Sequence, residues 1–422
     1  MFEKLARAEM KALGASGLPM LVIDHPLGGE APDGVARRVT QAIDQLAALI
    51  GGSAASQADA LGGRAEEAGL RAHPEPGTEA LVLDEEDVYP TFVAREWCDG
   101  LPIVAPTPER VRAMLAGARA DGAESLGAMP PIWRAATLEK LAVNAVMAGA
   151  EPRYFPVIVA AVEAMLDPAF NLYGVQATTH PVAPLVIVNG PYARAIDMHA
   201  GSGLFGPGFR ANATIGRALR LILMNVGGAW PGRHDMATQG SPAKFSYAIA
   251  EREDRSPWEP MHAALGFRAD ESVVTVYGGE PPHNVNDHVS TTAAGILNNV
   301  ADVAATLGSN VGWYMSQSQL LVVLGPEHAA TIAADGLSRA DVQRFVFEHA
   351  RIPLGRLKLG GMWGMHDWPV WMQKATDEGA MLPQVLSPED IFVLVAGGSG
   401  KHSAVVPNCT FSRTVSRRID RV

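Results

Sequence analysis

Residues 185–226 read LVIVNGPYARAIDMHAGSGLFGPGFRANATIGRALRLILMNV, and this stretch decides the fold class. It opens with an apolar run at 185–188 that is typical of a buried strand, and it closes with a helical pattern over 211–226. Apolar side chains recur there every three or four residues, so one face of the helix is expected to contact a core. Between strand and helix lies the glycine-rich loop 201–208. A strand followed by an amphipathic helix favours a layered α/β fold.

The same alternation continues along the rest of the chain. Helices are expected over residues 108–119, 137–149, 156–166 and 339–350, and strands over residues 273–277, 320–324 and 391–396. We therefore predict that residues 80–422 form one large α/β domain, a layered mixed sheet with flanking helices.

The N-terminal residues 1–50 read as a helix, a strand at 20–23 and a second helix at 35–50. One strand cannot make a sheet, because parallel strands need neighbours and helices on both faces. The segment is therefore predicted to be the tail of a smaller α/β domain, which docks on the rest of the chain or completes a sheet in a partner. Residues 51–79 are rich in Gly, Ala, Ser and Glu, a composition typical of a flexible linker.

Composition excludes several classes of function. With 34 Lys and Arg against 45 Asp and Glu, the net charge of −11 disfavours nucleic-acid binding. The longest apolar runs are strand-sized, well short of the ~20 residues that cross a bilayer. Cys98 and Cys409 are the only cysteines, which excludes a disulfide framework and a cysteine zinc site. A cytoplasmic location is expected.

The first candidate site is the loop 201–208 with the start of the following helix. Backbone N–H groups and the helix dipole favour an anion there, and arginine clamps carboxylate or phosphate. The predicted substrate-binding residues are Gly206, Gly208, Arg210, Asn212 and Arg217. The alternative is a tight loop with Asn212 as an ordinary N-cap. The loop also matches GxGxxG, but no strand directly precedes it, so no dinucleotide is invoked and the cofactor is unknown.

The second candidate site is the run AGGSGKHS at 396–403, which follows a predicted strand. We predict Lys401 for charge, His402 for proton transfer and Ser403 as a hydrogen-bond donor. The alternative is a glycine turn with an exposed Lys-His pair. Glu251, in a charged run, is predicted to be a general base, and the alternative there is a solvated charge run with no catalytic role.

Histidines in polar loops offer a third kind of chemistry. His234, His283 and His288 each lie near an aspartate, a pairing that can bind metal or exchange protons. None has the spacing of a known metal-binding helix such as HExxH, so no metal ligand is assigned. His328 is expected in the first turn of a helix.

Several longer motifs add a resemblance to a known family. DGLPIVAPTPERVRAML, TLEKLAVNAVMAGAEPRYFPVIVAAVEAM, GPGFRANATIGRALRLILMNVGG and AGGSGKHS together resemble the large C-terminal domain of the UGSC family of (seleno)proteins, over most of residues 90–405. In that family a smaller domain carries a U/C-G-S-C motif, followed by a segment similar to LARAEMKALGASGLPMLVIDHPLGG at 5–29. This sequence contains no CGSC, so the motif residue carries over to no position.

The sequence thus leads to one favoured function and two alternatives. The favoured function is an enzyme, or the substrate-binding subunit of one, that acts on a small anion held by residues 206–212. The resemblance implies thiol or selenol redox chemistry, which a CGSC- or UGSC-containing subunit would supply, and hence an oxidoreductase. The alternatives are a metal-assisted hydrolase or lyase that uses the loop histidines, and a non-catalytic structural partner of a CGSC-bearing protein. The partners considered besides that subunit are the small anion and, as a homo-oligomer, further copies of the chain.

Overall fold

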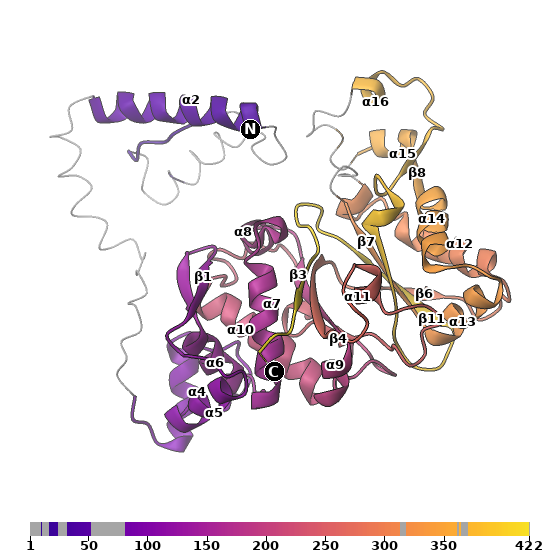
Figure 1. Cartoon of the computed structure of the whole chain (residues 1–422). Coiled ribbons are helices and arrows are strands. Elements are labelled where there is room, and N and C mark those ends of the chain that lie inside the picture. The colour runs from indigo at the N-terminus through magenta and orange to yellow at the C-terminus, as the bar shows by residue number, and fades with distance from the viewer. Residues whose placement is uncertain are drawn as a thin grey trace. The chain divides into compact units, whose positions relative to one another are not determined.

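Figure 1 shows the computed structural model of the chain, which describes residue 10 and residues 17–23, 32–51, 81–312, 318–360, 363 and 370–421. Contacts divide the chain into two compact units, Met1–Leu83 and Asp84–Val422. Almost all of the first predicted helix and of the predicted linker lies outside the described residues.

In the first unit one long helix is described, α2 at Pro32–Gly51, which confirms the predicted second helix. The predicted strand at 20–23 is wrong, because these residues are assigned no strand and pair with none in the described ranges. The Val22 N–H instead donates to Gln45 Oε1 at 2.7 Å, and the Gln45 amide donates back to the Val22 carbonyl. The glutamine side chain thus bonds both backbone groups, as a neighbouring strand would. The apolar stripe of α2, including Val39 and Ile43, is exposed.

The second unit contains two four-stranded sheets. The first has the order β12-β5-β3-β4, with β3 at Ala183–Asn189, β4 at Ala248–Ala250, β5 at Val273–Gly279 and β12 at Val415–Arg418. The second has the order β10-β7-β11-β6, with β6 at His283–Asn286, β7 at Leu320–Leu324, β10 at Ile391–Val395 and β11 at His402–Pro407. In each sheet a parallel pair, β3 with β4 or β7 with β10, continues into an antiparallel strand.

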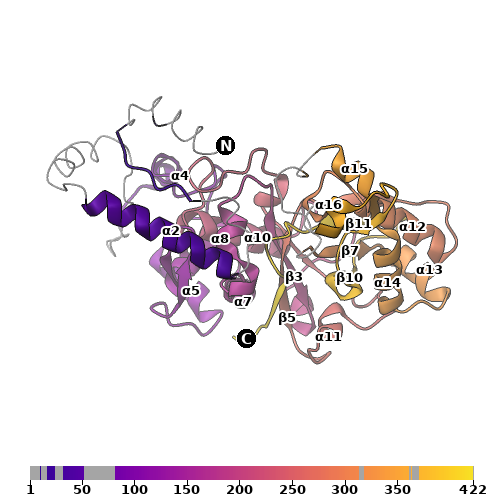
Figure 2. The same cartoon turned by 90° about the horizontal axis from the view of Figure 1, so that it is seen from above.

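Helices cover the outer face of each sheet, so the unit has four layers. The principal helices are α6 at Leu138–Met147, α7 at Phe155–Met165 and α10 at Arg210–Asn225 on the first sheet, and α12 at Ala293–Ala304, α13 at Pro326–Ala334 and α14 at Arg339–His349 on the second. Figure 2 shows helices, sheet, sheet and helices in succession. The predicted layered α/β class is confirmed, and it contains two mixed sheets.

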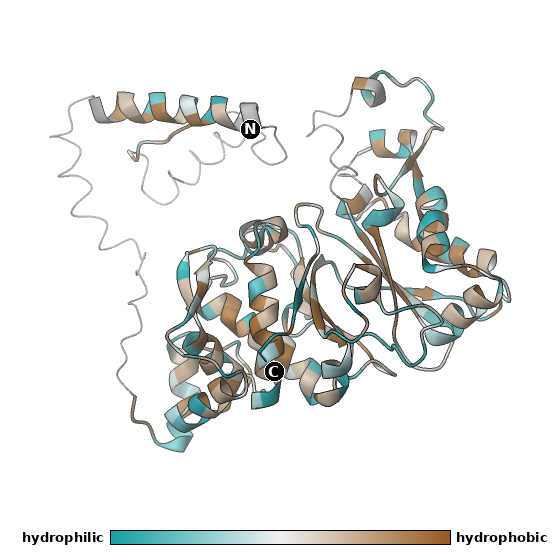
Figure 3. Cartoon of the chain, viewed as in Figure 1, coloured by the Kyte–Doolittle hydropathy of each residue, from teal (hydrophilic) through white to brown (hydrophobic). Residues whose placement is uncertain are grey.

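The alternation of side chains along the strands explains these layers. Val186 and Val188 of β3 belong to the core beneath α6, α7 and α10, whereas Leu185 and Ile187 face the second sheet. Leu321 and Val323 of β7 face back toward them, while alternate β7 residues pack against α12 and α14. Because both faces of the central strands are buried, these strands are apolar at nearly every position, as Figure 3 shows.

Shorter elements complete the second unit. They are α4 Glu85–Ala94, α5 Pro108–Ala116, β1 Ser125–Met129, β2 Arg134–Thr137, η1 Pro152–Tyr154, η2 Pro168–Phe170, α8 Leu172–Gln176, α9 Pro191–Ala195, η3 Pro242–Lys244, α11 Met261–Ala264, η4 Asn310–Gly312, β8 Arg351–Pro353, α15 Leu354–Lys358, α16 Val370–Lys374, β9 Met381–Pro383 and η5 Pro388–Asp390.

The two sheets exchange one strand each. β3, β4 and β5 follow one another along the chain in the first sheet, and the next strand, β6, crosses to pair with β11 in the second sheet. β7, β10 and β11 repeat this order, after which β12 crosses back to pair with β5. The two halves therefore share one topology and each completes the other's sheet, although no repeat is evident in the sequence.

The exchange takes place where the chain leaves β5 and β11. The Glu280 N–H donates to the Pro407 carbonyl at 2.9 Å, so the two departing segments touch. A Cβ at Gly279 would lie 2.9 Å from Val406 Cγ1, closer than carbon atoms pack. Glycine at this position lets the two strands cross.

Among the described residues no single helix is long and apolar enough to cross a bilayer; only the bent pair Pro152–Met165 with Pro168–Gln176 reaches that length and composition together.

Candidate functional site

The two glycine-rich loops predicted as separate sites lie against each other. The Gly397 N–H donates to the Ala200 carbonyl at 2.8 Å. A Cβ at Gly398 would lie 2.8 Å from Ser202 Cα and would overlap the Ser202 side chain, so only glycine fits. The loop after β10 is therefore held against the loop that leads into α10.

Arg252 ties this contact to the end of β4. Its backbone N–H donates to the Val395 carbonyl at 2.7 Å, and its Nη1 donates to the Gly397 carbonyl at 3.1 Å. The carboxyl ends of β4 and β10 consequently meet beside the two loops. In open α/β sheets, ligands bind outside the carboxyl ends of the strands.

The arginines predicted to bind an anion have protein partners. Arg210 forms an ion pair with Glu151 at 2.8 Å and donates to the Gly149 carbonyl at 3.2 and 3.1 Å. Arg217 makes two bonds to Asp99, each at 2.8 Å, in a half-buried setting. Both guanidinium groups hold α10 against earlier parts of the chain.

Asn212 is a buried clamp between backbone segments. Its Oδ1 accepts from the His199 N–H at 2.8 Å, and its Nδ2 donates to the carbonyls of His199 at 2.9 Å and Ala248 at 3.1 Å. The N-cap of α10 is Phe209, so the alternative of Asn212 as N-cap is wrong. Gly206 N–H closes a turn on the Gly203 carbonyl at 2.7 Å.

Gly208 lies directly before the helix. Its φ of 117° is a conformation that favours glycine, and it turns the chain from the loop into Phe209. The Phe209 ring stacks on His199 with a centroid separation of 3.3 Å and an interplanar angle of 4°. The predicted loop 201–208 is thus closed by a hydrogen bond of its own and by the stacking of the two rings that flank it.

Lys401 and His402 meet a second histidine at the carboxyl end of β6. His402 Nε2 lies 3.1 Å from His288 Nε2, with the rings at 82°. His402 Nδ1 lies 3.0 Å from Asn284 Oδ1, and Lys401 Nζ donates to the His288 carbonyl at 3.3 Å. Because Asn284 Oδ1 can only accept, it fixes the proton on His402 Nδ1 and leaves Nε2 as the acceptor from His288.

Ser403 points away from this pair, beneath α13. Its Oγ lies 2.8 Å from His328 Nδ1 and accepts from the Gly325 N–H at 3.0 Å. His328 Nε2 lies 3.0 Å from the Asp287 carbonyl, so this buried ring bonds one residue beside each member of the His288–His402 pair. His328 does lie in the first turn of a helix as expected, but its part in this network was missed.

Asp287 places a fixed negative charge next to the pair. Burial alone would raise the pKa of its carboxyl, but hydrogen bonds from Ser290, Val289 and Asn299 outweigh burial and lower that pKa to about 2. The carboxylate is therefore ionised at neutral pH and holds the loop that carries His288.

Glu251 is a buried residue that directly follows β4. Its carboxylate is buried, with Oε2 accepting from Asn189 Nδ2 at 2.6 Å and the Met261 N–H at 2.7 Å. Arg339 approaches Oε1 to 3.7 Å. Burial raises the pKa of Glu251, and the Arg339 charge opposes that shift. In this position Glu251 joins β4 to α11 and α14.

The remaining reactive side chains are dispersed. His234 Nδ1 contacts the Gly228 carbonyl at 3.0 Å, and His283 is exposed on β6. In the described ranges no three His, Cys, Asp or Glu side chains converge as metal ligands. Both cysteines are buried and unpaired, and burial raises the pKa of Cys409 to about 12. That thiol is protonated at neutral pH and a poor nucleophile.

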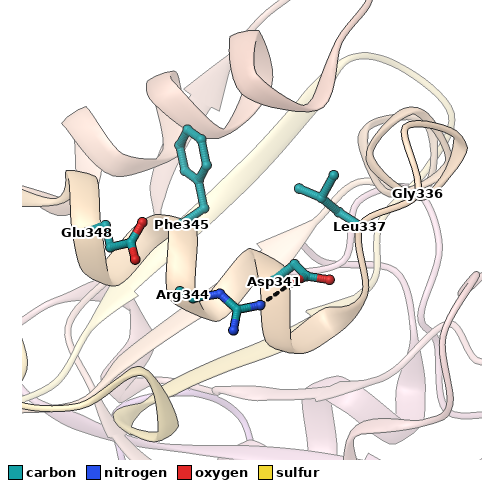
Figure 4. Close-up of a pocket in the computed structure, with 6 residues that line it drawn as sticks. All are labelled: Gly336, Leu337, Asp341, Arg344, Phe345 and Glu348. Atoms are coloured by element: carbon teal, nitrogen blue, oxygen red, sulfur yellow. Dashed lines mark hydrogen bonds and ion pairs between the residues drawn. The ribbon is translucent and has the colours of Figure 1, made fainter.

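A surface hollow lies elsewhere, on α14, between Leu337, Phe345 and the ion pair of Asp341 with Arg344, as Figure 4 shows. It contains none of the predicted site residues.

Comparison with known proteins supports one part of the resemblance. Residues 1–52 match the model of the UGSC family, the segment in which the sequence 5–29 resembles that family. No curated protein and no solved structure matches the chain.

Proposed function

We propose that the chain is an enzyme, or the substrate-binding subunit of one, that acts on a small anionic substrate at the carboxyl ends of β6, β7 and β10. The observation that carries the proposal is the 3.1 Å contact between His288 and His402 beside Lys401. An imidazole pair with a lysine combines the two things such a reaction needs, a proton relay and a counter-charge.

The histidine pair would transfer protons. His402 Nε2 is the acceptor, because Asn284 holds the proton on Nδ1, and His288 donates to it. His288 is the oriented donor for a substrate that takes its proton. Once that proton leaves the contact, the lone pair of His402 Nε2 is free to accept another. The exposed position of both rings gives a substrate access.

Lys401 would bind the negative charge. Its one protein acceptor among the described residues is the His288 carbonyl at 3.3 Å, so the ammonium keeps donors for a ligand. Arg210, Arg217 and Asn212 would support the neighbouring glycine loop through their protein contacts, and Glu251 would position the end of β4.

The redox part of the proposal rests on residues 1–52 and their match to the UGSC family. We propose that a CGSC- or UGSC-containing subunit supplies a thiol or selenol to this site. The complex of the chain with that subunit would then be a cytoplasmic oxidoreductase. The high pKa of Cys409 supports an outside source for that group.

The test compares variants in binding and turnover. Inorganic phosphate serves as the binding probe in titration calorimetry on the full chain, and small carboxylates, phosphate monoesters and thioesters serve as the turnover panel, with and without a co-purified CGSC protein. Lys401→Met should weaken phosphate about tenfold, whereas Lys374→Met, which removes one exposed positive charge elsewhere, should change it less than twofold. His288→Gln and His402→Gln should each lower kcat about 10²–10⁴-fold.

If Lys401→Met leaves the phosphate affinity unchanged, phosphate does not bind at this site. Turnover that survives both histidine changes would exclude the proton-relay role. A complex with the CGSC protein whose turnover is unaffected by all three changes would favour the structural-partner alternative.

A second candidate function is favoured by the same distance. Two imidazole nitrogens bound to one Zn²⁺ at ~2.0–2.1 Å and a tetrahedral angle lie about 3.3 Å apart, close to the 3.1 Å observed. His402 Nδ1–H on Asn284 is also the outer bond that metal-binding histidines make. Zinc titration after chelator treatment separates the candidates: a stoichiometric metal required for turnover and lost in His288→Gln would identify a metal-assisted hydrolase or lyase.

A further inference from the structure

A narrow pocket at the amino ends of β3 and β4 is lined by two cations, Arg220 and Lys244, that share one carboxylate outside the lining, Asp235. It lies at the opposite end of these strands from Asn189 and Ala250, and so away from the histidine pair. The pocket is lined by Val182, Ala183, Pro184, Gly216, Leu219, Arg220, Leu223, Ala243, Lys244 and Tyr247.

Asp235 is the only carboxylate that the two cations contact within the described residues. Lys244 Nζ donates to both of its oxygens, at 2.8 and 2.7 Å, and Arg220 Nη2 donates to Oδ2 at 3.0 Å. The Ala237 N–H adds a fourth bond at 3.1 Å. All three charged side chains are largely buried, with 3% of Asp235, 11% of Arg220 and 13% of Lys244 exposed.

The cluster carries one positive charge in excess and has donors to spare. Among the described residues Arg220 donates through Nη2 alone, to Asp235 and the Ala229 carbonyl, so its Nε and Nη1 groups have no protein acceptor. Lys244 uses two of its three N–H groups, both on Asp235. These donors belong to side chains that line the pocket, whose other walls are mostly apolar.

An excess positive charge in such a place favours the binding of an anion. Burial lowers the pKa of Lys244, the bond and charge of Asp235 oppose that shift, and Arg220 adds repulsion. A bound anion would restore neutrality and accept the free N–H groups, and charge-assisted bonds of this kind are among the strongest in proteins.

We propose that this pocket binds the carboxylate of a small organic acid of about the size of acetate, with its oxygens on Lys244 and Arg220 and its methyl group against Leu219 and Leu223. The narrowness of the pocket selects a compact monoanion, and the apolar walls favour a carboxylate that carries a short alkyl group. The site is separate from the proposed reaction at His288 and His402, so a negative result for one proposal does not bear on the other.

The experiment is titration calorimetry of acetate into the full chain at low ionic strength. Saturable binding is expected, weakened about tenfold or more in Lys244→Met. That variant keeps the one-to-one pair of Asp235 with Arg220, so folding is expected to persist. Arg268→Met is the matched control, because it removes one exposed positive charge outside the pocket, and it should change the dissociation constant less than twofold.

Leu219→Phe is the second variant, which fills the pocket and leaves both cations in place. It should abolish acetate binding, and it keeps the proposal testable if Lys244→Met does not fold. Absence of saturable acetate binding to the wild-type chain overturns the proposal, as does binding that survives both changes. Chloride that competes with equal affinity would overturn the assignment to a carboxylate.

Discussion

Replacing Asn212 by alanine separates a structural role from a ligand-binding role. Its side-chain amide makes three bonds to backbone groups of His199 and Ala248 and has no further polar atom to offer a substrate. The change should therefore lower the free energy of unfolding rather than the affinity for an anion.

The size of the loss follows from those bonds. A hydrogen bond is worth about 0.5–1.5 kcal/mol net, and a buried partner left without one costs more. Two of the three bonds go to His199, which is half-buried, and water will replace part of them. Loss of the third bond leaves the buried Ala248 carbonyl without its partner from Asn212. The sum is about 3 kcal/mol.

Urea unfolding of the full chain, followed by tryptophan fluorescence, measures this loss. Arg210→Met is the matched control, because it also removes a predicted anion ligand, but its exposed ion pair with Glu151 is worth less than about 1 kcal/mol. Phosphate titration on both variants completes the comparison, and the dissociation constant should change less than about threefold in each.

The opposite pattern would refute this interpretation. If Asn212→Ala keeps its stability within about 0.5 kcal/mol and binds phosphate tenfold more weakly, Asn212 is a substrate ligand as the sequence first suggested. The three hydrogen bonds of Asn212 would then contribute nothing measurable to the free energy of unfolding.

Three further changes test other contacts in the second unit. Arg339→Met leaves the buried Glu251 carboxylate unpaired and should cost about 3–5 kcal/mol, as read by urea unfolding; a loss below about 1 kcal/mol would show that the pair is unimportant. The folded-state pKa of Asp287 is lowered to about 2, so the stability that its carboxylate contributes is complete above the unfolded pKa of about 3.9 and is lost as the pH falls toward 2. Asp287→Asn should therefore flatten the plot of unfolding free energy against pH in that window, and an unchanged plot would contradict the pKa shift. Gly398→Ala forces the loop after β10 away from Ser202 and should weaken phosphate binding with little change in global stability. Adding Ser202→Gly to that variant should recover part of the lost phosphate affinity. If Gly398→Ala has no effect on phosphate binding, the two loops act separately.

Much of the layered fold was predictable from local patterns. The strand at 320–324 was predicted within its observed bounds, because a strand buried on both faces is apolar throughout. Thr107 caps α5 as its residue type favours, and its side chain accepts from the Arg110 N–H. Thr137, placed inside the predicted helix 137–149, is the N-cap of α6. The N-terminal strand failed because the apolar run at 20–23 fits a strand by composition, while strand formation depends on a neighbour.

The site was predictable in composition but not in contacts. Arginine and asparagine at the start of α10 have the chemistry to bind an anion and equally to bind carboxylates and backbone groups of the protein. Only the fold brings Glu151 to Arg210 and Ala248 to Asn212. The same limit applies to His288 and His402, which are 114 residues apart and gave no sign in the sequence that their rings meet.

The exchange of strands explains why this pair belongs to neither half of the second unit alone. His288 follows β6, which the first half contributes, and His402 begins β11, which the second half contributes. The pairing of β6 with β11 sets Asn286 opposite His402, so the register of the exchanged strand fixes how the two rings approach. His328 then bonds one residue on each side of that junction. A one-residue slip would turn His402 to the opposite face of the sheet and separate the rings. The proposed proton relay therefore depends on the pairing of β6 with β11, which joins the two halves.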